Sequence, residues 1–184
     1  NVNFFNASSD ALDSDYSSGT IVNTKFEDIG GDALDFSGSE AMIKKMIATR
    51  VKDKAISVGE KSNLNIFDIN FKKIGVGVVS KDGSKTIINN CKIEDPFLAG
   101  LMTYVKKKNY SYPSLIAKNC DITFGTYADT KKEIQTKKKY FRQIGTSLNV
   151  DDVNYIPEKS LNVDLLYSSS VMKKNKVKSK CNAI

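Results

Sequence analysis

The stretch GDALDFSGS at residues 31–39 follows SDALDSDYS at residues 9–17 and repeats its Asp-Ala-Leu-Asp core after 22 positions. The same step of 22 generates further columns of similar residues along the chain. The columns are Ala11, Ala33, Ala55, Gly77 and Ala99; Leu12, Leu34, Ile56, Val78 and Gly100; Ser14, Phe36, Val58, Ser80 and Met102; and Phe4, Phe26, Ala48 and, after one inserted residue, Phe71 and Ile93. Self-similarity at a fixed period of this length indicates a repeat protein.

Glycine, serine, asparagine and aspartate separate these columns, so each repeat has room for two or three short strands joined by tight turns. The Leu-x-x-Leu-x-Leu spacing of leucine-rich repeats is absent, and helical repeats are longer, at roughly 33 residues or more. We therefore predict an all-β fold, a right-handed parallel β-helix solenoid with about 22 residues per turn. Because paired strands lie about 4.8 Å apart, each apolar column would form a continuous internal ladder.

The repeat also predicts how the chain is divided. Solenoid turns are expected over residues 1–123, and residues 124–184 are expected to form an irregular C-terminal cap with a basic tail. Within this cap we predict strands near 144–150 and a short helix near 160–168. The opening NVNFFN already fits the second strand of a turn, which predicts further turns or another domain upstream, because an uncapped edge invites aggregation.

Composition narrows the functional classes. The 184 residues carry a net charge of +7 and contain no histidine, three cysteines and only two arginines. A surface rich in lysine but poor in arginine argues against sequence-specific nucleic-acid binding, because arginine makes most of the bidentate contacts to bases. No apolar run is long enough for a membrane span. Without histidine or a CxxC pair, a structural zinc site and Ser-His or Cys-His catalysis are not expected. Cys91 and Cys120 are predicted to be stacked interior thiols, because a disulfide between neighbouring parallel strands would strain the ladder.

Strand alternation directs two pairs of aspartates outward near the N-terminal end. Asp13 and Asp35 are expected to stack about 4.8 Å apart, and Asp10 and Asp32 form a second stacked pair at the start of the strand. Carboxylates this close repel each other unless something compensates their charge. A calcium ion bound by these four residues, two nearby lysines or a shared proton would each do so. Alternatively, Asp10 and Asp32 cap turn amides as part of the scaffold.

An insertion, YVKKKNYSYPS at residues 104–114, lengthens one turn and brings aromatic and basic residues together. Tyrosine faces stack on sugar rings, and lysine can pair with uronate or sulfate. We therefore predict contacts to an acidic sugar; the predicted residues are Tyr104, Lys106, Tyr110 and Tyr112, together with Lys54 from the aspartate column. The alternative is a loop packed by its own aromatic residues.

Three stretches, GGDALDFSGS, DKAISVGEKSNLNI and GVGVVSKDGSKTIINNC, resemble the pectin-lyase-like superfamily of right-handed β-helices, which includes pectate lyases, polygalacturonases, and alginate and chondroitin lyases. GDALDFSGS is similar to the Gly-Asp-Asp strand of polygalacturonases, with Asp32 on the second aspartate and Gly31 on the first. GEKSN at 59–63 resembles the Lys-Ser-x-x-Asn strand of the alginate and chondroitin lyases, which implies that Lys61 is the proton-abstracting base, assisted by calcium on nearby acids.

Each of these catalytic patterns lacks a partner in this chain. The Ser-His-Gly and Arg-Ile-Lys stretches of polygalacturonases are absent, and SKDGS stands where the lyases place an arginine. We therefore predict a non-catalytic or degenerate carbohydrate-associated module, located outside the cell or in the cell envelope, that binds acidic polysaccharide. The alternatives are a polysaccharide lyase or hydrolase that uses Asp13, Asp35 and Lys61 along an outer cleft, and a purely structural adhesin or tail-like solenoid.

Overall fold

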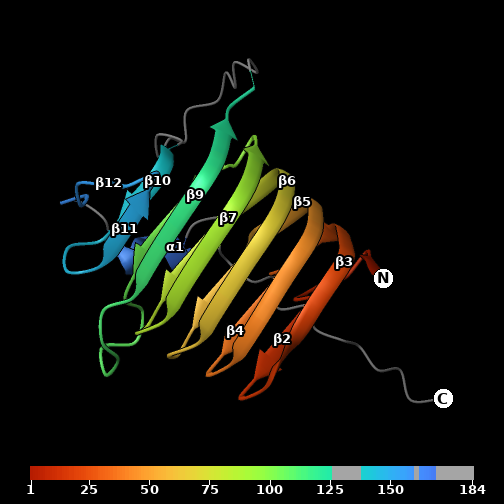
Figure 1. The fold of residues 1–184 in the computed structure, drawn as a ribbon, viewed down its shortest axis with the longest axis horizontal. Coiled ribbons are helices and arrows are strands. Elements are labelled where there is room, and N and C mark those ends of the chain that lie inside the picture. The colour runs from red at the N-terminus through yellow and green to blue at the C-terminus, as the bar shows by residue number, and fades with distance from the viewer. Residues whose placement is uncertain (126–137, 160–161, 169–184) are drawn as a thin grey trace.

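The computed structural model describes residues 1–125, 138–159 and 162–168, and it confirms the predicted parallel β-solenoid. Strands from successive turns stack side by side from the N-terminal to the C-terminal end (Figure 1). The elements are β1 (Val2–Phe5), β2 (Leu12–Asp15), β3 (Ser18–Ile29), β4 (Leu34–Ser37), β5 (Glu40–Gly59), β6 (Asn63–Lys81), β7 (Lys85–Glu94), β8 (Ala99–Tyr104), β9 (Ser114–Thr123), β10 (Lys138–Arg142), β11 (Ser147–Val150), β12 (Val153–Asn154) and α1 (Val163–Ser168).

Each turn of the solenoid contributes to three sheet faces. Face A consists of β2, β4, the last residues of β5 and β6, β8 and β10. Face B consists of the first residues of β3, β5, β6, β7 and β9, together with β11. Face C consists of β1, the end of β3, the middle of β5 and β6, and the ends of β7 and β9. The pairing from turn to turn on all three faces is parallel.

The chain bends between faces at residues with a left-handed backbone. These residues have φ values between 48° and 66° and recur once per turn, mostly in steps of 22 or 23. The B–C edge has Asn23, Lys45, Asp68, Asn90 and Asn119, and the C–A edge has Asn6, Asp28, Arg50, Lys73 and Asp95. Asparagine and aspartate tolerate this conformation better than other non-glycine residues. The Asn and Asp residues between the apolar columns therefore have a direct structural purpose.

The interior contains the predicted ladders, with one change of register. Leu34, Ile56 and Val78 are fully buried and lie opposite one another on face A, and the ring of Phe4 stacks on Phe26 with centroids 4.8 Å apart. At the fifth turn, however, Val78 pairs with Leu101 and not with Gly100, so the predicted columns at this turn are wrong by one residue.

The cause of this slip is one extra residue between β7 and β8. Glu94 still pairs with Lys72, 22 positions back, whereas Ala99 pairs with Val76, 23 positions back. The amides of Phe97 and Leu98 still bond to the carbonyls of Ile74 and Gly75 as in the 22-residue register, so the extra residue lies directly before β8. Met102, predicted in an interior column, consequently lies on the outside of face A.

The solenoid continues beyond the end that the sequence predicted. β10 pairs with β8, and β11 pairs with β9, both in parallel, so these strands form part of a sixth turn. β12 then pairs antiparallel with β11 at the C-terminal end. The strand predicted near 144–150 corresponds to β11, and α1 lies within the region predicted to be helical. The predicted basic tail lies outside the described residues.

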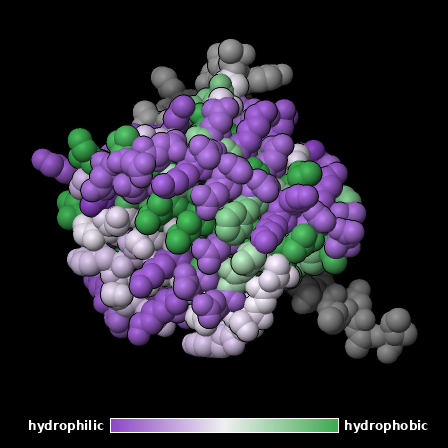
Figure 2. Space-filling view, in the orientation of Figure 1, coloured by the Kyte–Doolittle hydropathy of each residue, from purple (hydrophilic) through white to green (hydrophobic). Residues whose placement is uncertain are grey.

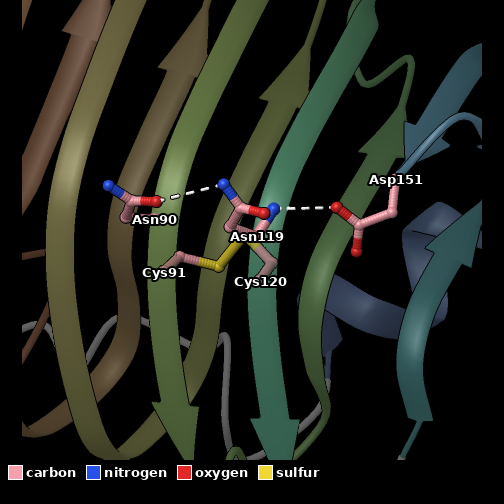
Figure 3. Close-up of a disulfide and its surroundings, with 5 residues drawn as sticks. All are labelled: Asn90, Cys91, Asn119, Cys120 and Asp151. Atoms are coloured by element: carbon pink, nitrogen blue, oxygen red, sulfur yellow. Dashed lines mark hydrogen bonds between the residues drawn. A yellow bond between two sulfur atoms is a disulfide. The ribbon is translucent and has the colours of Figure 1, made fainter.

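The prediction of free interior thiols is wrong for Cys91 and Cys120, which form a disulfide between β7 and β9 (Figure 3). These residues are direct partners in neighbouring turns, with Cα atoms 4.4 Å apart, which lies within the range that a disulfide can bridge. Beside the disulfide, Asn119 Nδ2 donates to Asn90 Oδ1 at 3.3 Å, and the Asn119 amide donates to Asp151 Oδ1 at 2.7 Å. The fourth, fifth and sixth turns are thus linked at this edge.

Candidate functional site

The repeated Asp-Ala-Leu-Asp segments lie where face A begins, and their first aspartates form a hydrogen-bonded ladder. Asp10 Oδ1 accepts a hydrogen bond of 2.8 Å from the backbone amide of Asp32. One turn later, Asp32 Oδ1 accepts a bond of 2.9 Å from the backbone amide of Lys54. Each carboxylate therefore caps the amide at the equivalent position of the next turn. This geometry supports the scaffold interpretation of Asp10 and Asp32.

Lys54 continues this column as a buried cation. It is 1% exposed, and its Nζ lies 3.0 Å from Asp32 Oδ1 and 2.7 Å from Asp53 Oδ2. Its Nζ also lies 5.8 Å from the centroid of the Tyr167 ring. Lys54 was predicted to contact an acidic sugar, but the structure places it in this interior ion-pair network and not at the open surface.

Asp32 and Asp53 share the one ammonium of Lys54, and this buried environment raises the pKa values of both Asp53 and Lys54. Burial and the neighbouring Asp32 carboxylate raise the pKa of Asp53 to about 7, against the lowering effect of Lys54. Burial lowers the pKa of Lys54, but Asp32 and Asp53 more than offset this and raise it above its ordinary value. The network therefore keeps Lys54 charged while Asp53 takes up a proton near neutral pH.

The second pair of aspartates faces outward, as predicted. Asp13 and Asp35 are partners on neighbouring turns, and Ser57 follows Asp35 in the same column. Asp35 Oδ1 lies 3.7 Å from Nζ of Lys81, which belongs to the fourth turn. Lys81 reaches across the third turn because Gly59 has no side chain there: a Cβ at Gly59 would lie 2.7 Å from Lys81 Cε.

Of the three ways to compensate the aspartates, the geometry favours nearby lysines. Lys54 pairs with Asp32, and Lys81 faces Asp35. Across residues 1–125, 138–159 and 162–168, no group of three or more His, Cys, Asp or Glu side chains is placed to hold a metal ion. Calcium binding by Asp10, Asp13, Asp32 and Asp35 stays a prediction that this geometry does not support.

The outer surface of face A is covered over its later turns by α1. The outward side chains of β6, β8 and β10 form an apolar cluster of Val76, Val79, Leu98, Ala99, Met102, Tyr104 and Phe141. Leu166 of α1 is buried in this cluster, and Val163 and Tyr167 pack against it. The outward column therefore changes from Asp13 and Asp35 to apolar residues, and the cleft expected along this sheet is closed by the chain itself at its C-terminal turns.

Tyr104, predicted to meet a sugar, belongs to this covered region. It is fully buried, and its hydroxyl lies 2.7 Å from the hydroxyl of Tyr167. Burial and the interaction with Tyr167 raise the pKa of Tyr104 well above its ordinary value, so the Tyr104 hydroxyl stays neutral within this hydrogen bond. Lys106 Nζ also lies close to Tyr167, 4.2 Å from the centroid of its ring.

The insertion after β8 follows a different course, along the edge between faces A and B. This A–B edge comprises residues 16–17, 38–39, 60–62, 82–84, 105–113 and 143–146 of the six turns. Asp82 is fully buried there and anchors the insertion, because its Oδ1 accepts bonds from the backbone amides of Lys106 at 2.7 Å and Lys107 at 2.8 Å. Lys107 also pairs with Glu60 of the third turn.

The insertion keeps aromatic and basic groups at the surface of this edge. Tyr112 is 64% exposed, and Tyr110 is partly exposed with Lys61 Nζ 5.9 Å from its ring centroid. Lys61 is an exposed bend residue with a φ of 66°. Lys61 thus lies at the A–B edge beside Tyr110, whereas Asp13 and Asp35 lie on the strands of face A. Of the predicted sugar contacts, Tyr110, Tyr112 and Lys106 lie in one loop, whereas Lys54 and Tyr104 lie in the covered interior.

Other parts of the surface contrast with this edge. In the view of Figure 2, which shows the strands of β3 to β9, the surface is mostly hydrophilic and apolar side chains interrupt it in separate places. Val22, Ile87 and Ile116 of face B are 39%, 41% and 42% exposed. Exposed tyrosine therefore gathers at the A–B edge, whereas exposed lysines also lie on the strand surface, among them Lys44, Lys85 and Lys118.

Several residues that organise face A and the A–B edge were not among those predicted from the sequence. Asp53 and Lys81 complete the ion pairs, Asp82 anchors the insertion, and Tyr167 covers Lys54. Only Lys81 had a usable signal, since Gly59 directly precedes it in its 22-residue column and leaves room for a long side chain. The position of Tyr167 depends on how α1 returns to face A, which no local pattern specifies.

Comparison with known proteins identifies the repeat region. A family model described as a right-handed β-helix region matches residues 1–128. Searches of curated proteins and of solved structures gave no match. Within the described residues, no helix has the length and apolar character needed to cross a membrane.

Proposed function

Because this chain belongs to the family of right-handed β-helix proteins, we propose that it is a non-catalytic module that binds acidic polysaccharide along its A–B edge. The observation that carries the proposal is the position of the insertion. Residues 105–113 are anchored by Asp82 and present Tyr110 and Tyr112 beside Lys61. A β-helix fold alone does not specify function, so the proposal depends on this edge.

The chemistry of the edge suits a chain of acidic sugars. An exposed tyrosine ring offers a flat apolar face for a sugar ring, with a hydroxyl at its rim. Lys61, Lys106 and Lys108 are exposed in the same region and can pair with carboxylates or sulfates. Two acidic side chains of this edge have partners within the chain: Glu60 pairs with Lys107, and the buried Asp82 accepts hydrogen bonds from the backbone of the insertion.

Closure of face A supports a role in binding over one in catalysis. Lys61, the residue implied as a base by the resemblance to lyases, lies at the A–B edge, while Asp35 faces Lys81 on the sheet. General acid–base catalysis requires such groups to reach the same reacting atoms. α1 also covers the later turns of the sheet on which a cleft was expected.

We also propose that the protein acts outside the cell or in the cell envelope. The supporting observation is the disulfide between Cys91 and Cys120. Structural disulfides form and persist mainly in oxidising compartments. The neighbouring hydrogen bonds at Asn90 and Asn119 place this disulfide in the scaffold of the fourth and fifth turns (Figure 3).

The test is retention on immobilised polygalacturonate and alginate, with product formation measured in the same samples. We expect the wild-type protein to be retained without new absorbance from unsaturated sugar ends, and a Tyr110→Ala/Tyr112→Ala variant to elute earlier. Phe5→Ala is the matched control, because Phe5 is 53% exposed and has Lys25 Nζ 5.6 Å from its ring centroid on face C. Equal retention of all three proteins, or product formation by the wild type, would contradict the proposal.

A further inference from the structure

Tyr16 lies at the A–B edge in the first turn, four turns before the insertion. Its side chain is 79% exposed, the largest exposure of any aromatic residue among those described. The ring lies against the second turn, where Gly38 has a φ of 62° and a Cβ would lie only 2.7 Å from ring atoms Cδ1 and Cε1 of Tyr16. The missing side chain of Gly38 thus allows one side of the exposed Tyr16 ring to approach the second turn.

The two tyrosines of the insertion extend the same edge. Ser111 contacts Gly83 of the fourth turn, and the ring of Tyr112 packs against Gly145 of the sixth turn. Tyr110 lies between these ends, beside Lys61 of the third turn. Aromatic rings thus lie along the edge at the first and second turns (Tyr16 against Gly38), beside the third turn (Tyr110 at Lys61) and against the sixth turn (Tyr112 at Gly145).

We propose that Tyr16, Tyr110 and Tyr112 form one continuous track that binds a single extended acidic polysaccharide chain parallel to the solenoid axis. This inference rests on the proposed function of the A–B edge and adds the direction and length of the ligand. Five intervals of about 4.8 Å separate the first turn from the sixth, so the track is about 24 Å long. A chain of about five sugar residues would span it.

Charge over the third to fifth turns of the track favours a ligand with acidic groups, whereas the exposed Asp15 and Glu40 flank the track at its first two turns. Lys61 lies beside Tyr110, and Lys106 and Lys108 are exposed in the insertion. Because these cations follow the edge from the third turn to the insertion, a polyuronate can meet them in succession while its rings contact tyrosines. A neutral polysaccharide would contact only the tyrosine faces and should bind more weakly.

The experiment measures the affinity of the full chain for galacturonate oligomers of increasing length, from the dimer to the octamer, by calorimetry. We expect affinity to rise with length and to level off at about five residues, when the oligomer spans the track. Tyr16→Ala should weaken binding of the hexamer by about fivefold, the equivalent of one aromatic contact. It should leave the trimer unchanged, because a trimer can bind beside Tyr110 and Tyr112 alone, and Tyr16→Trp should restore hexamer affinity.

Two outcomes would overturn the track separately from the proposed function. One is hexamer binding by Tyr16→Ala that equals the wild type, and the other is an affinity that stops rising at the trimer. In both, the edge binds polysaccharide but Tyr16 takes no part. Failure of the wild type to bind any oligomer or polymer would instead overturn the proposed function, and the track with it. Phe5→Ala again serves as the control for loss of an exposed aromatic ring elsewhere.

Discussion

Asp32 Oδ1 accepts hydrogen bonds from both the backbone amide and the side-chain ammonium of Lys54, at 2.9 and 3.0 Å. One turn earlier, Asp10 Oδ1 makes the backbone bond to Asp32. The repetition of Asp-Ala-Leu-Asp is therefore explained first by scaffolding: each aspartate caps the amide of the next turn. What changes at the third turn is that a buried ammonium joins the cap and brings Asp53 into the network.

The first prediction concerns the charge of Lys54. Lys54→Met keeps a side chain of similar length but leaves Asp32 and Asp53 buried without their cation. Removing one partner of a buried ion pair costs about 3–5 kcal/mol, because the remaining charge is uncompensated. We expect a loss of this size in the free energy of unfolding, measured by urea denaturation monitored by circular dichroism.

Lys72→Met is the matched control, because Lys72 is 53% exposed in its ion pair with Glu94. Exposed pairs contribute at most about 1 kcal/mol, so this variant should lie close to the wild type. Adding Asp53→Asn to Lys54→Met should recover part of the lost stability, because asparagine removes a buried acid that must otherwise be charged or take up a proton to fold. Equal stability of the two lysine variants would show that Lys54 does not compensate the aspartates.

The second prediction concerns pH. Burial and Asp32 raise the pKa of Asp53 from 3.8 to about 7 in the folded protein. Between these values the folded state binds a proton that the unfolded state has lost, so the contribution of Asp53 to stability is complete below about pH 4 and declines as the pH rises to about 7. The decline amounts to at most about 4 kcal/mol, since one pKa unit corresponds to about 1.4 kcal/mol.

Asp53→Asn tests this prediction, because asparagine does not titrate. Urea unfolding of both proteins should be measured at intervals from about pH 4 to about pH 8. The variant should lose the downward slope in this interval, while the contributions of Glu27 and Asp28, whose pKa values are lowered by hydrogen bonds from Lys25 and Arg50, remain. A variant with the same slope as the wild type would assign the titration to another group.

The sequence was sufficient to predict the parts of this fold that repeat. The columns through Leu34 and Phe26, and the outward direction of Asp13 and Asp35, follow from a period of 22 and strand alternation. Two errors arose where the chain departs from that local pattern. One extra residue directly before β8 shifted the fifth turn, and the surroundings of Lys54 include Tyr167 of α1, which lies more than 100 residues further along the chain.

The disulfide was missed for a different reason. Cys91 and Cys120 were placed correctly on neighbouring turns, but strain was expected to keep them reduced. At positions directly opposite in a parallel ladder, the Cα separation of 4.4 Å already allows the link. The A–B edge could be predicted only in part, because Tyr110 and Tyr112 were recognisable as an insertion, whereas Tyr16 lies four turns earlier, against Gly38 of the second turn.

The third prediction concerns this disulfide. It closes a loop of 29 residues, for which the chain-entropy model predicts about 3.5 kcal/mol of stabilisation. We expect the Cys91→Ser/Cys120→Ser variant to unfold at lower urea concentration than the wild type by a corresponding amount. Thiol titration of the unfolded wild-type chain should show two additional thiols after reduction. An unchanged thiol count would mean that the two cysteines are not linked.

The fourth prediction compares neighbouring leucines of α1. Leu166 is 2% exposed in the apolar cluster on face A, whereas Leu165 is 58% exposed. Truncating a buried leucine costs about 2–5 kcal/mol, so Leu166→Ala should destabilise the protein by an amount in this range and Leu165→Ala by less than about 1 kcal/mol. The expected difference requires that α1 and the sheet unfold together, and urea denaturation of both variants measures it. If both variants unfold like the wild type, α1 does not contribute to the stability of face A, and the sheet would be accessible where we describe it as covered.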